Sequence, residues 1–134
     1  MVFVYFVNAF AKTPEGGNPA GVCLEKGLSD AHMQRIAADV GFSETAFVMP
    51  SSKADYRVRF FTPFTEVALC GHATIAAYHF MRENGQVVPG KYTQETKAGV
   101  LAIEVEKNAV WMDQNPPQYL GVLDRSVSSW LERV

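Results

Sequence analysis

The alternation of apolar and polar residues along the chain predicts several short strands interrupted by two amphipathic helices. The segments expected as strands are rich in valine, phenylalanine, tyrosine and other β-formers, and they are 2–7, 20–24, 44–49, 56–61, 91–96, 100–106 and 110–112. The last three are typical of consecutive antiparallel strands. The mixed order of strands and helices predicts an α+β domain built on a mainly antiparallel sheet.

Both helices carry signals for where they begin or end. Ser29 is a suitable N-cap for the first helix and Gly41 is a suitable terminator. The second helix is expected from Gly71 to about Glu83, and Asn84-Gly85 should stop it. The residues expected to face the sheet are Met33, Ile36, Ala37 and Val40 in the first helix, and Ala73, Ala76, Ala77, Phe80 and Met81 in the second.

Composition narrows the functional classes. The 134 residues suit one domain, or one lobe of something larger. With a net charge of −2 and no cluster of Lys and Arg, we expect no nucleic-acid partner. No apolar run approaches membrane-spanning length, and the apolar first residues lack a basic region and a cleavage site. The two cysteines form no CxxC pair, so a cytoplasmic protein is the default expectation.

The most informative stretch runs from Phe60 to Ala77, where a predicted strand is followed by the second helix. A carboxylate (Glu66), a thiol (Cys70) and an imidazole (His72) are placed around the start of that helix. The backbone N–H groups of a first helical turn lack intrahelical partners, and the helix dipole favours negative charge there. This turn therefore suits the carboxylate of a small anionic ligand.

Several ordered motifs resemble those of one known family. They are Gly-Asn-Pro-Ala-Gly-Val at 17–22, Ser-Glu-Thr-Ala-Phe-Val at 43–48, Phe-Thr-Pro at 61–63 with Glu66, Cys-Gly-His-Ala-Thr at 70–74, and the later segments 96–101 and 110–113. They look like the successive signatures of the PhzF-like proteins, the phenazine-biosynthesis isomerase family within the diaminopimelate epimerase-like fold. The resemblance covers residues 2 to about 117.

The resemblance implies a protein of two lobes with the ligand in the cleft between them. Each lobe would be a sheet wrapped around a central helix, and here the central helix would begin at Gly71. Members of the family are usually about twice as long as this chain. Residues 1–117 would thus form the N-terminal lobe, and 118–134 would be a connection or a helical tail with Leu123, Val127, Trp130 and Leu131 at helical spacing.

The resemblance also implies roles for individual residues. Glu44, in a mostly apolar segment, would be the acid/base that shuttles a proton. His72 would be a neutral imidazole that donates a hydrogen bond to the substrate, because the positive end of the helix dipole disfavours its charged form. Gly71 and Ala73 would offer backbone N–H groups to the ligand. Each residue also has a structural reading, as a partly buried carboxylate, a loop-binding histidine or a tight turn.

Two further residues have two readings each, and a third has one. Asn18 either binds a ligand carboxylate or stabilises the turn before Pro19. Cys70 corresponds to a catalytic base in the epimerase branch, where a thiol at a helix N-terminus would have a lowered pKa, or it is a buried, inert thiol. Glu66 is expected to be structural, bonding N–H groups near the helix start.

No metal, phosphate-loop or nucleotide motif is present, so we expect neither a metal nor a cofactor. His79 lies two helical turns from His72, about 10 Å away along the axis, so the two cannot share a metal.

Three functional hypotheses follow. The first is an isomerase or epimerase that moves a proton on a small carboxylate-bearing metabolite without a cofactor. The second is an inactive or fragmentary lobe that acts as a binding or oligomerisation module. The third is thiol-based epimerase chemistry through Cys70, which needs a partner cysteine that Cys23 gives no evident reason to supply. A single lobe would leave an apolar face exposed, so we also expect a homodimer.

Overall fold

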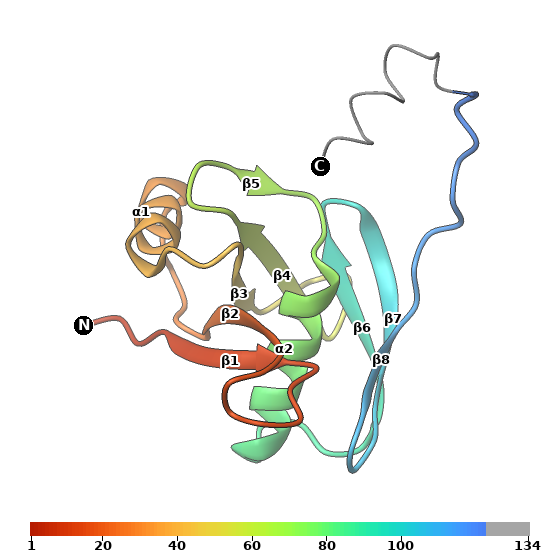
Figure 1. The fold of residues 1–134 in the computed structure, drawn as a ribbon, viewed down its shortest axis with the longest axis horizontal. Coiled ribbons are helices and arrows are strands. Elements are labelled where there is room, and N and C mark those ends of the chain that lie inside the picture. Colours follow the sequence, from red (N-terminus) through yellow and green to blue (C-terminus); the bar gives the residue numbers. More distant parts are fainter. Residues whose placement is uncertain (123–134) are drawn as a thin grey trace.

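A strongly curled sheet surrounds one helix in the computed structural model, which describes residues 1–122 (Figure 1). The surrounded helix is the second in the chain, and the first helix stands outside the sheet. The strands are β1 (Tyr5–Ala9), β2 (Asn18–Cys23), β3 (Thr45–Met49), β4 (Tyr56–Phe61), β5 (Glu66–Val67), β6 (Gly90–Thr96), β7 (Gly99–Val105) and β8 (Val110–Met112), and the helices are α1 (Asp30–Val40) and α2 (Gly71–Glu83).

The strand order explains where the helices lie. The sheet runs β1-β2-β3-β4-β6-β7-β8, with β5 paired to β4. Two neighbouring pairs, β2 with β3 and β4 with β6, are parallel, and the other pairs are antiparallel. Parallel neighbours need a crossover connection, and α1 and α2 supply these two crossovers. The predicted α+β fold, with a mixed and mainly antiparallel sheet around a central helix, is confirmed.

Alternating side chains on the strands build two apolar cores. On the inner face, residues such as Val22, Ala46 and Phe60 pack with the buried side of α2. On the outer face, Cys23, Phe47 and Phe61 pack with Met33 and Ala37 of α1. Successive side chains of a strand point to opposite faces, so the same strands serve both helices. The predicted inner-face residues of both helices belong to these cores, except for Val40, which is half-buried and lies in neither.

The helix ends follow the predicted signals. The Ser29 side chain accepts a hydrogen bond from the His32 N–H, and the Gly41 N–H bonds the Ala37 carbonyl from a left-handed backbone conformation with φ 75°. Helix α2 begins directly after Cys70 and ends before Asn84. Strand boundaries differ by a few residues from expectation, and β5 was not predicted because two residues are too short to show alternation.

Glu66 does not bond the helix start, which corrects the sequence-based expectation. Its carboxylate accepts two hydrogen bonds from the Arg59 guanidinium, at 2.8 and 2.7 Å, and lies 2.8 Å from Lys97 Nζ. Arg59 also donates to Asp30 on α1, at 2.7 Å. The carboxylate therefore ties β5 to β4 and to the β6–β7 turn, while Arg59 connects this group to α1.

This ion-pair cluster predicts acid sensitivity. The Arg59 hydrogen bonds lower the pKa of Glu66 from 4.5 to about 2. A lowered pKa stabilises the fold above the unfolded value, and this contribution is lost as the pH falls from about 4.5 towards 2. We expect Glu66→Gln to lower the free energy of unfolding at pH 7 by about 1–3 kcal/mol. Denaturant titrations at pH 7 and at low pH test this, and an equal loss at both would contradict it.

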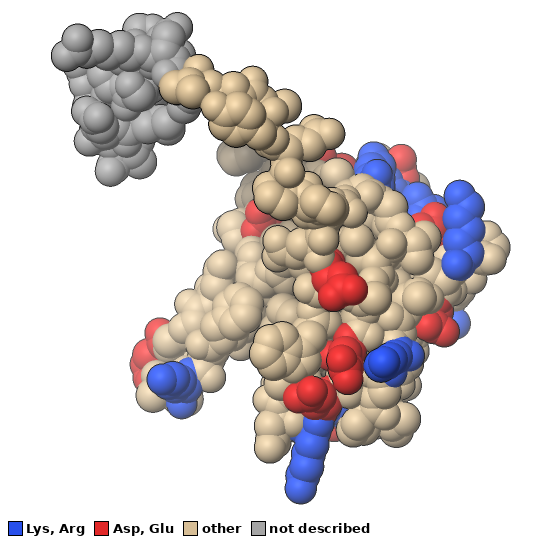
Figure 2. All heavy atoms as spheres, turned by 90° about the vertical axis from the view of Figure 1, so that its right-hand side faces the viewer, with Lys and Arg blue, Asp and Glu red and all other residues tan. Residues whose placement is uncertain are grey.

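The surface of the described residues bears on the expected charge distribution, on membrane insertion and on self-association. Figure 2 shows Lys and Arg scattered among Asp and Glu on the face that it displays. Within residues 1–122, neither helix has the length and apolar character needed to cross a membrane. Large apolar side chains are exposed, including those of Phe6, Phe64 and Trp111, but self-association remains a prediction. The expected tail helix, with Leu123 to Leu131, lies outside the described residues.

Candidate functional site

Three reactive side chains meet at the N-terminus of α2. Glu44 immediately precedes β3, Cys70 is the N-cap residue of α2, and His72 lies in its first turn. His72 Nε2 is 3.5 Å from Glu44 Oε2, and His72 Nδ1 is 3.2 Å from Cys70 Sγ. Ser43 Oγ also lies 3.5 Å from Nε2. The fold thus joins two motifs that are separated by more than twenty residues in the sequence.

Backbone and buried polar contacts hold this cluster in place. The Gly21 N–H of β2 donates to the Glu44 carbonyl at 3.2 Å. On the other side, the Thr74 hydroxyl donates to the Cys70 carbonyl at 2.7 Å and accepts from buried Gln94 of β6 at 3.3 Å. Glu44 and Cys70 are therefore each anchored to a neighbouring strand of the sheet.

The thiol of Cys70 is not activated, which favours the second of its two readings, a buried and inert thiol. Burial raises the pKa of Cys70 to about 11, and the nearby Glu44 carboxylate adds to this rise. The N–H groups of the first turn of α2 act in the opposite direction but do not outweigh burial. At neutral pH the thiol is protonated, so it is not a base in the resting protein.

The cysteine pair required for thiol-based epimerase chemistry is not assembled within this chain. Cys23 packs in the outer core with α1, whereas Cys70 belongs to the inner core with α2. Both are free and buried. The sequence contains no further cysteine, so the third hypothesis finds no support in the structure.

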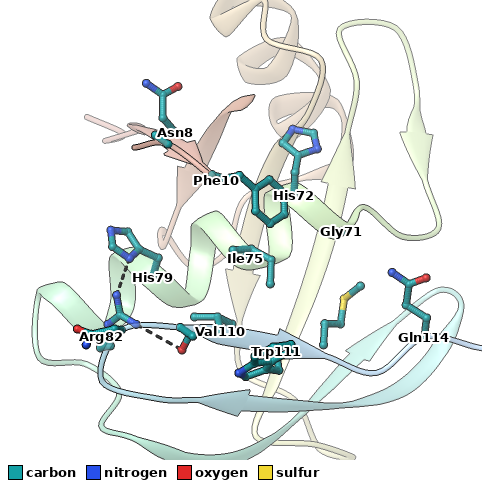
Figure 3. A pocket seen from close by; sticks show the side chains of 15 residues that line it. Asn8, Phe10, Gly71, His72, Ile75, His79, Arg82, Val110, Trp111 and Gln114 are labelled. Carbon is teal, nitrogen blue, oxygen red and sulfur yellow. Dashed lines mark hydrogen bonds between the residues drawn. The ribbon is translucent and has the colours of Figure 1, made fainter. Parts of the chain in front are cut away.

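A cavity of about 620 Å³ runs along α2 from this cluster (Figure 3). Gly71 and His72 line one end, and His79 and Arg82 line the other. Its walls come from the end of β1 and the loop after it, and from β8 with its flanking residues. Arg82 donates to His79 Nδ1 at 2.6 Å and to the Glu106 carbonyl at 2.9 Å. The cavity is thus apolar in the middle and polar at both ends.

The structure brings some of the predicted site residues together and places others elsewhere. Glu44, Cys70 and His72 lie together, and Gly71 and His72 also face the cavity. Ala73 is fully buried, so only its backbone can serve a ligand. Asn18 is exposed on β2 opposite Ala9 and does not line the cavity that the described residues form. The roles of these residues remain predictions.

Most of the residues that line the cavity were not among the predicted site residues. The cavity is lined by Asn8, Ala9, Phe10, Ala11, Gly71, His72, Ile75, His79, Arg82, Asn108, Ala109, Val110, Trp111, Met112 and Gln114. They come from both ends of the sheet, and only its curling brings those ends to the same helix. Helical spacing on α2 would have placed Ile75, His79 and Arg82 along one stripe beyond His72.

One family model matches most of the chain. Residues 7–119 match the family described as phenazine biosynthesis-like protein. The matched region contains all of the motifs that suggested this resemblance, and it includes every predicted site residue.

Curated relatives with high identity are isomerases by name. An uncharacterized isomerase of Bacillus subtilis, YfhB, is 42% identical over 117 residues, which are 83% of this chain and 40% of the relative. An uncharacterized isomerase of Escherichia coli K12, YddE, is 52% identical over 106 residues, or 78% of this chain and 36% of the relative. The chain therefore spans about two-fifths of the length of these relatives.

A solved structure has a similar fold. The Bacillus anthracis phenazine biosynthesis protein of the PhzF family superposes with a TM-score of 0.79 at 45% identity. The match covers 86% of this chain and 41% of that structure.

Proposed function

Because this chain belongs to the phenazine biosynthesis-like protein family, we propose that it provides one lobe of an isomerase that moves a proton on a small carboxylate-bearing metabolite. Glu44 is the acid/base, and no cofactor takes part. The observation that carries this proposal is the meeting of Glu44 and His72 at the N-terminus of α2, beside a cavity that Gly71 and His72 line.

The ligand carboxylate is held by the first turn of α2. The N–H groups of Gly71, His72 and Ala73 precede the first N–H that bonds within the helix, which is that of Thr74. The N-cap residue Cys70 makes no side-chain capping hydrogen bond. These groups, together with the helix dipole, favour an anion.

Glu44 then transfers the proton. Its carboxylate takes a proton from a C–H bond activated by the ligand's own acid or carbonyl group, and the electron pair of that bond delocalises onto the group. The glutamic acid returns the proton to another carbon, or to the other face of the same carbon, so no net proton is gained or lost. Nucleophilic attack and redox chemistry are not needed for this reaction.

Cys70 acts as a positioning residue. Its protonated thiol donates towards His72 Nδ1, 3.2 Å away. An Nδ1 atom that accepts this hydrogen bond leaves Nε2 as the donor of the ring, and Nε2 faces Glu44 Oε2 at 3.5 Å. His72 can thus donate a hydrogen bond to the negative charge that develops on the ligand.

Proton exchange with solvent tests the reaction class. We expect the protein, incubated in D₂O with small carboxylic acids that bear an activated C–H, to incorporate deuterium into at least one of them. Mass spectrometry of the recovered acids measures the incorporation. Binding of an acid without any exchange would contradict the proposal and favour the second hypothesis, a small-molecule-binding module.

A further inference from the structure

The Glu44, Cys70 and His72 cluster also has the composition of a metal site. One donor atom from each residue can be chosen so that all three lie within 4.8 Å of one another. The sequence did not suggest this set, because Glu44 lies 26 residues before Cys70 and the spacing matches no common metal motif. We propose that these three side chains bind a Zn²⁺ ion, which inhibits proton transfer by occupying Glu44.

The donor types select the metal. A thiolate, an imidazole and a carboxylate are the three ligand classes that Zn²⁺ uses in proteins. Mg²⁺ and Ca²⁺ prefer sites made wholly of oxygen, so the Cys70 sulfur disfavours both. Two anionic ligands, Glu44 and Cys70, would balance the charge of the ion.

Two donor-atom separations are close to those of a tetrahedral site, and one donor atom from each residue lies within 4.8 Å of the others. Ligand atoms around one Zn²⁺ lie roughly 3.3–3.7 Å apart, given Zn–N and Zn–O bonds of about 2.1 Å and Zn–S bonds of about 2.3 Å. The observed separations are 3.2 Å from Cys70 Sγ to His72 Nδ1 and 3.5 Å from His72 Nε2 to Glu44 Oε2. These contacts use different ring nitrogens, so Glu44 must shift towards Nδ1 when the ion binds there.

The surroundings complete the site. With Zn²⁺ on Nδ1, the opposite nitrogen of His72 faces Ser43 Oγ at 3.5 Å, which provides the outer hydrogen-bond partner typical of histidine ligands. Gly71 and His72 line the cavity, so the fourth coordination position can hold water or a ligand carboxylate. On binding, Sγ loses its proton to solvent and forms the Zn–S bond.

Cobalt substitution tests the binding directly. We expect Co²⁺ to bind one per chain and to produce a sulfur-to-cobalt charge-transfer absorption that Zn²⁺ abolishes by displacement. Cys70→Ala should remove this absorption and weaken metal binding by at least about tenfold, since even outer-shell changes cost that much. Cys23→Ala is the matched control, because it removes the other buried thiol and should leave the absorption unchanged.

The cobalt spectra of the wild-type protein and of Cys70→Ala can each overturn the proposed metal site. Absence of the charge-transfer band in the wild-type protein would overturn the proposal, and so would a band that persists in Cys70→Ala. If Cys70→Ala is unfolded by circular dichroism, His72→Asn provides the second test and should also weaken binding by at least about tenfold. These measurements need no substrate, so they test metal binding independently of the proposed isomerase activity. Only the inhibition of proton transfer by Zn²⁺ rests on that proposed function.

Discussion

Replacing Glu44 by glutamine is expected to lower the rate of deuterium incorporation by about 10²–10⁴-fold while the protein folds normally. The amide has nearly the same shape but cannot accept and return a proton. The side chain is 22% exposed and precedes the strand rather than filling the core, so the change should cost little stability. Mass spectrometry of each carboxylic acid that the wild-type protein labels measures the rate.

A matched variant separates this role from a general effect of charge. Glu104 is an exposed glutamate on β7, opposite Trp111 in the β7–β8 ladder. Glu104→Gln should retain the wild-type exchange rate. Deuterium incorporation that is undiminished in Glu44→Gln would refute the acid/base role.

Gly21→Ala should lower the free energy of unfolding by about 1–3 kcal/mol, the usual cost of overpacking. A Cβ at this position would lie 2.7 Å from Thr45 Oγ1 and 2.9 Å from Thr45 Cγ2, and Thr45 is fully buried. The strands must separate to relieve this contact. Because the Gly21 N–H also bonds the Glu44 carbonyl, the acid/base would move with them, and proton exchange should fall as well.

Further variants show whether this clash with Thr45 causes the loss of stability. Gly90→Ala should change stability by less than about 1 kcal/mol, since a Cβ there meets atoms only at 3.9 Å. Thr45→Ala added to Gly21→Ala removes both close atoms and should recover part of the lost stability. Denaturant titrations of the wild type, Gly21→Ala, Thr45→Ala and the double variant measure the coupling, and additive losses would contradict the explanation.

Local signals in the sequence predicted most elements of the fold. Ser29 and Gly41 marked the ends of α1 because capping depends on neighbouring residues alone. The β-forming residues of 56–61 predicted a strand, and β4 spans Tyr56–Phe61 as expected. The motif around Cys70 located the start of α2, which is the position on which the proposed site depends.

Long-range contacts were beyond the reach of these signals. The sequence did not pair Glu66 with Arg59, because either charge could have faced solvent or another partner. It left two readings of Cys70 open, a thiol activated by the helix dipole and a buried, inert thiol, and only the structure shows that burial has the larger effect on its pKa. It also did not reveal the cavity between β1 and β8, since their nearness depends on how far the whole sheet curls.

The most direct test of the account is to locate a bound carboxylate. An NMR titration of ¹⁵N-labelled protein with acetate, and separately with sulfate, reports on each backbone N–H group. We expect saturable shifts centred on Gly71, His72 and Ala73, with smaller shifts around Glu44. Shifts confined to other parts of the chain, or none at concentrations that saturate weak anion sites, would contradict the claim that the N-terminus of α2 is the ligand site.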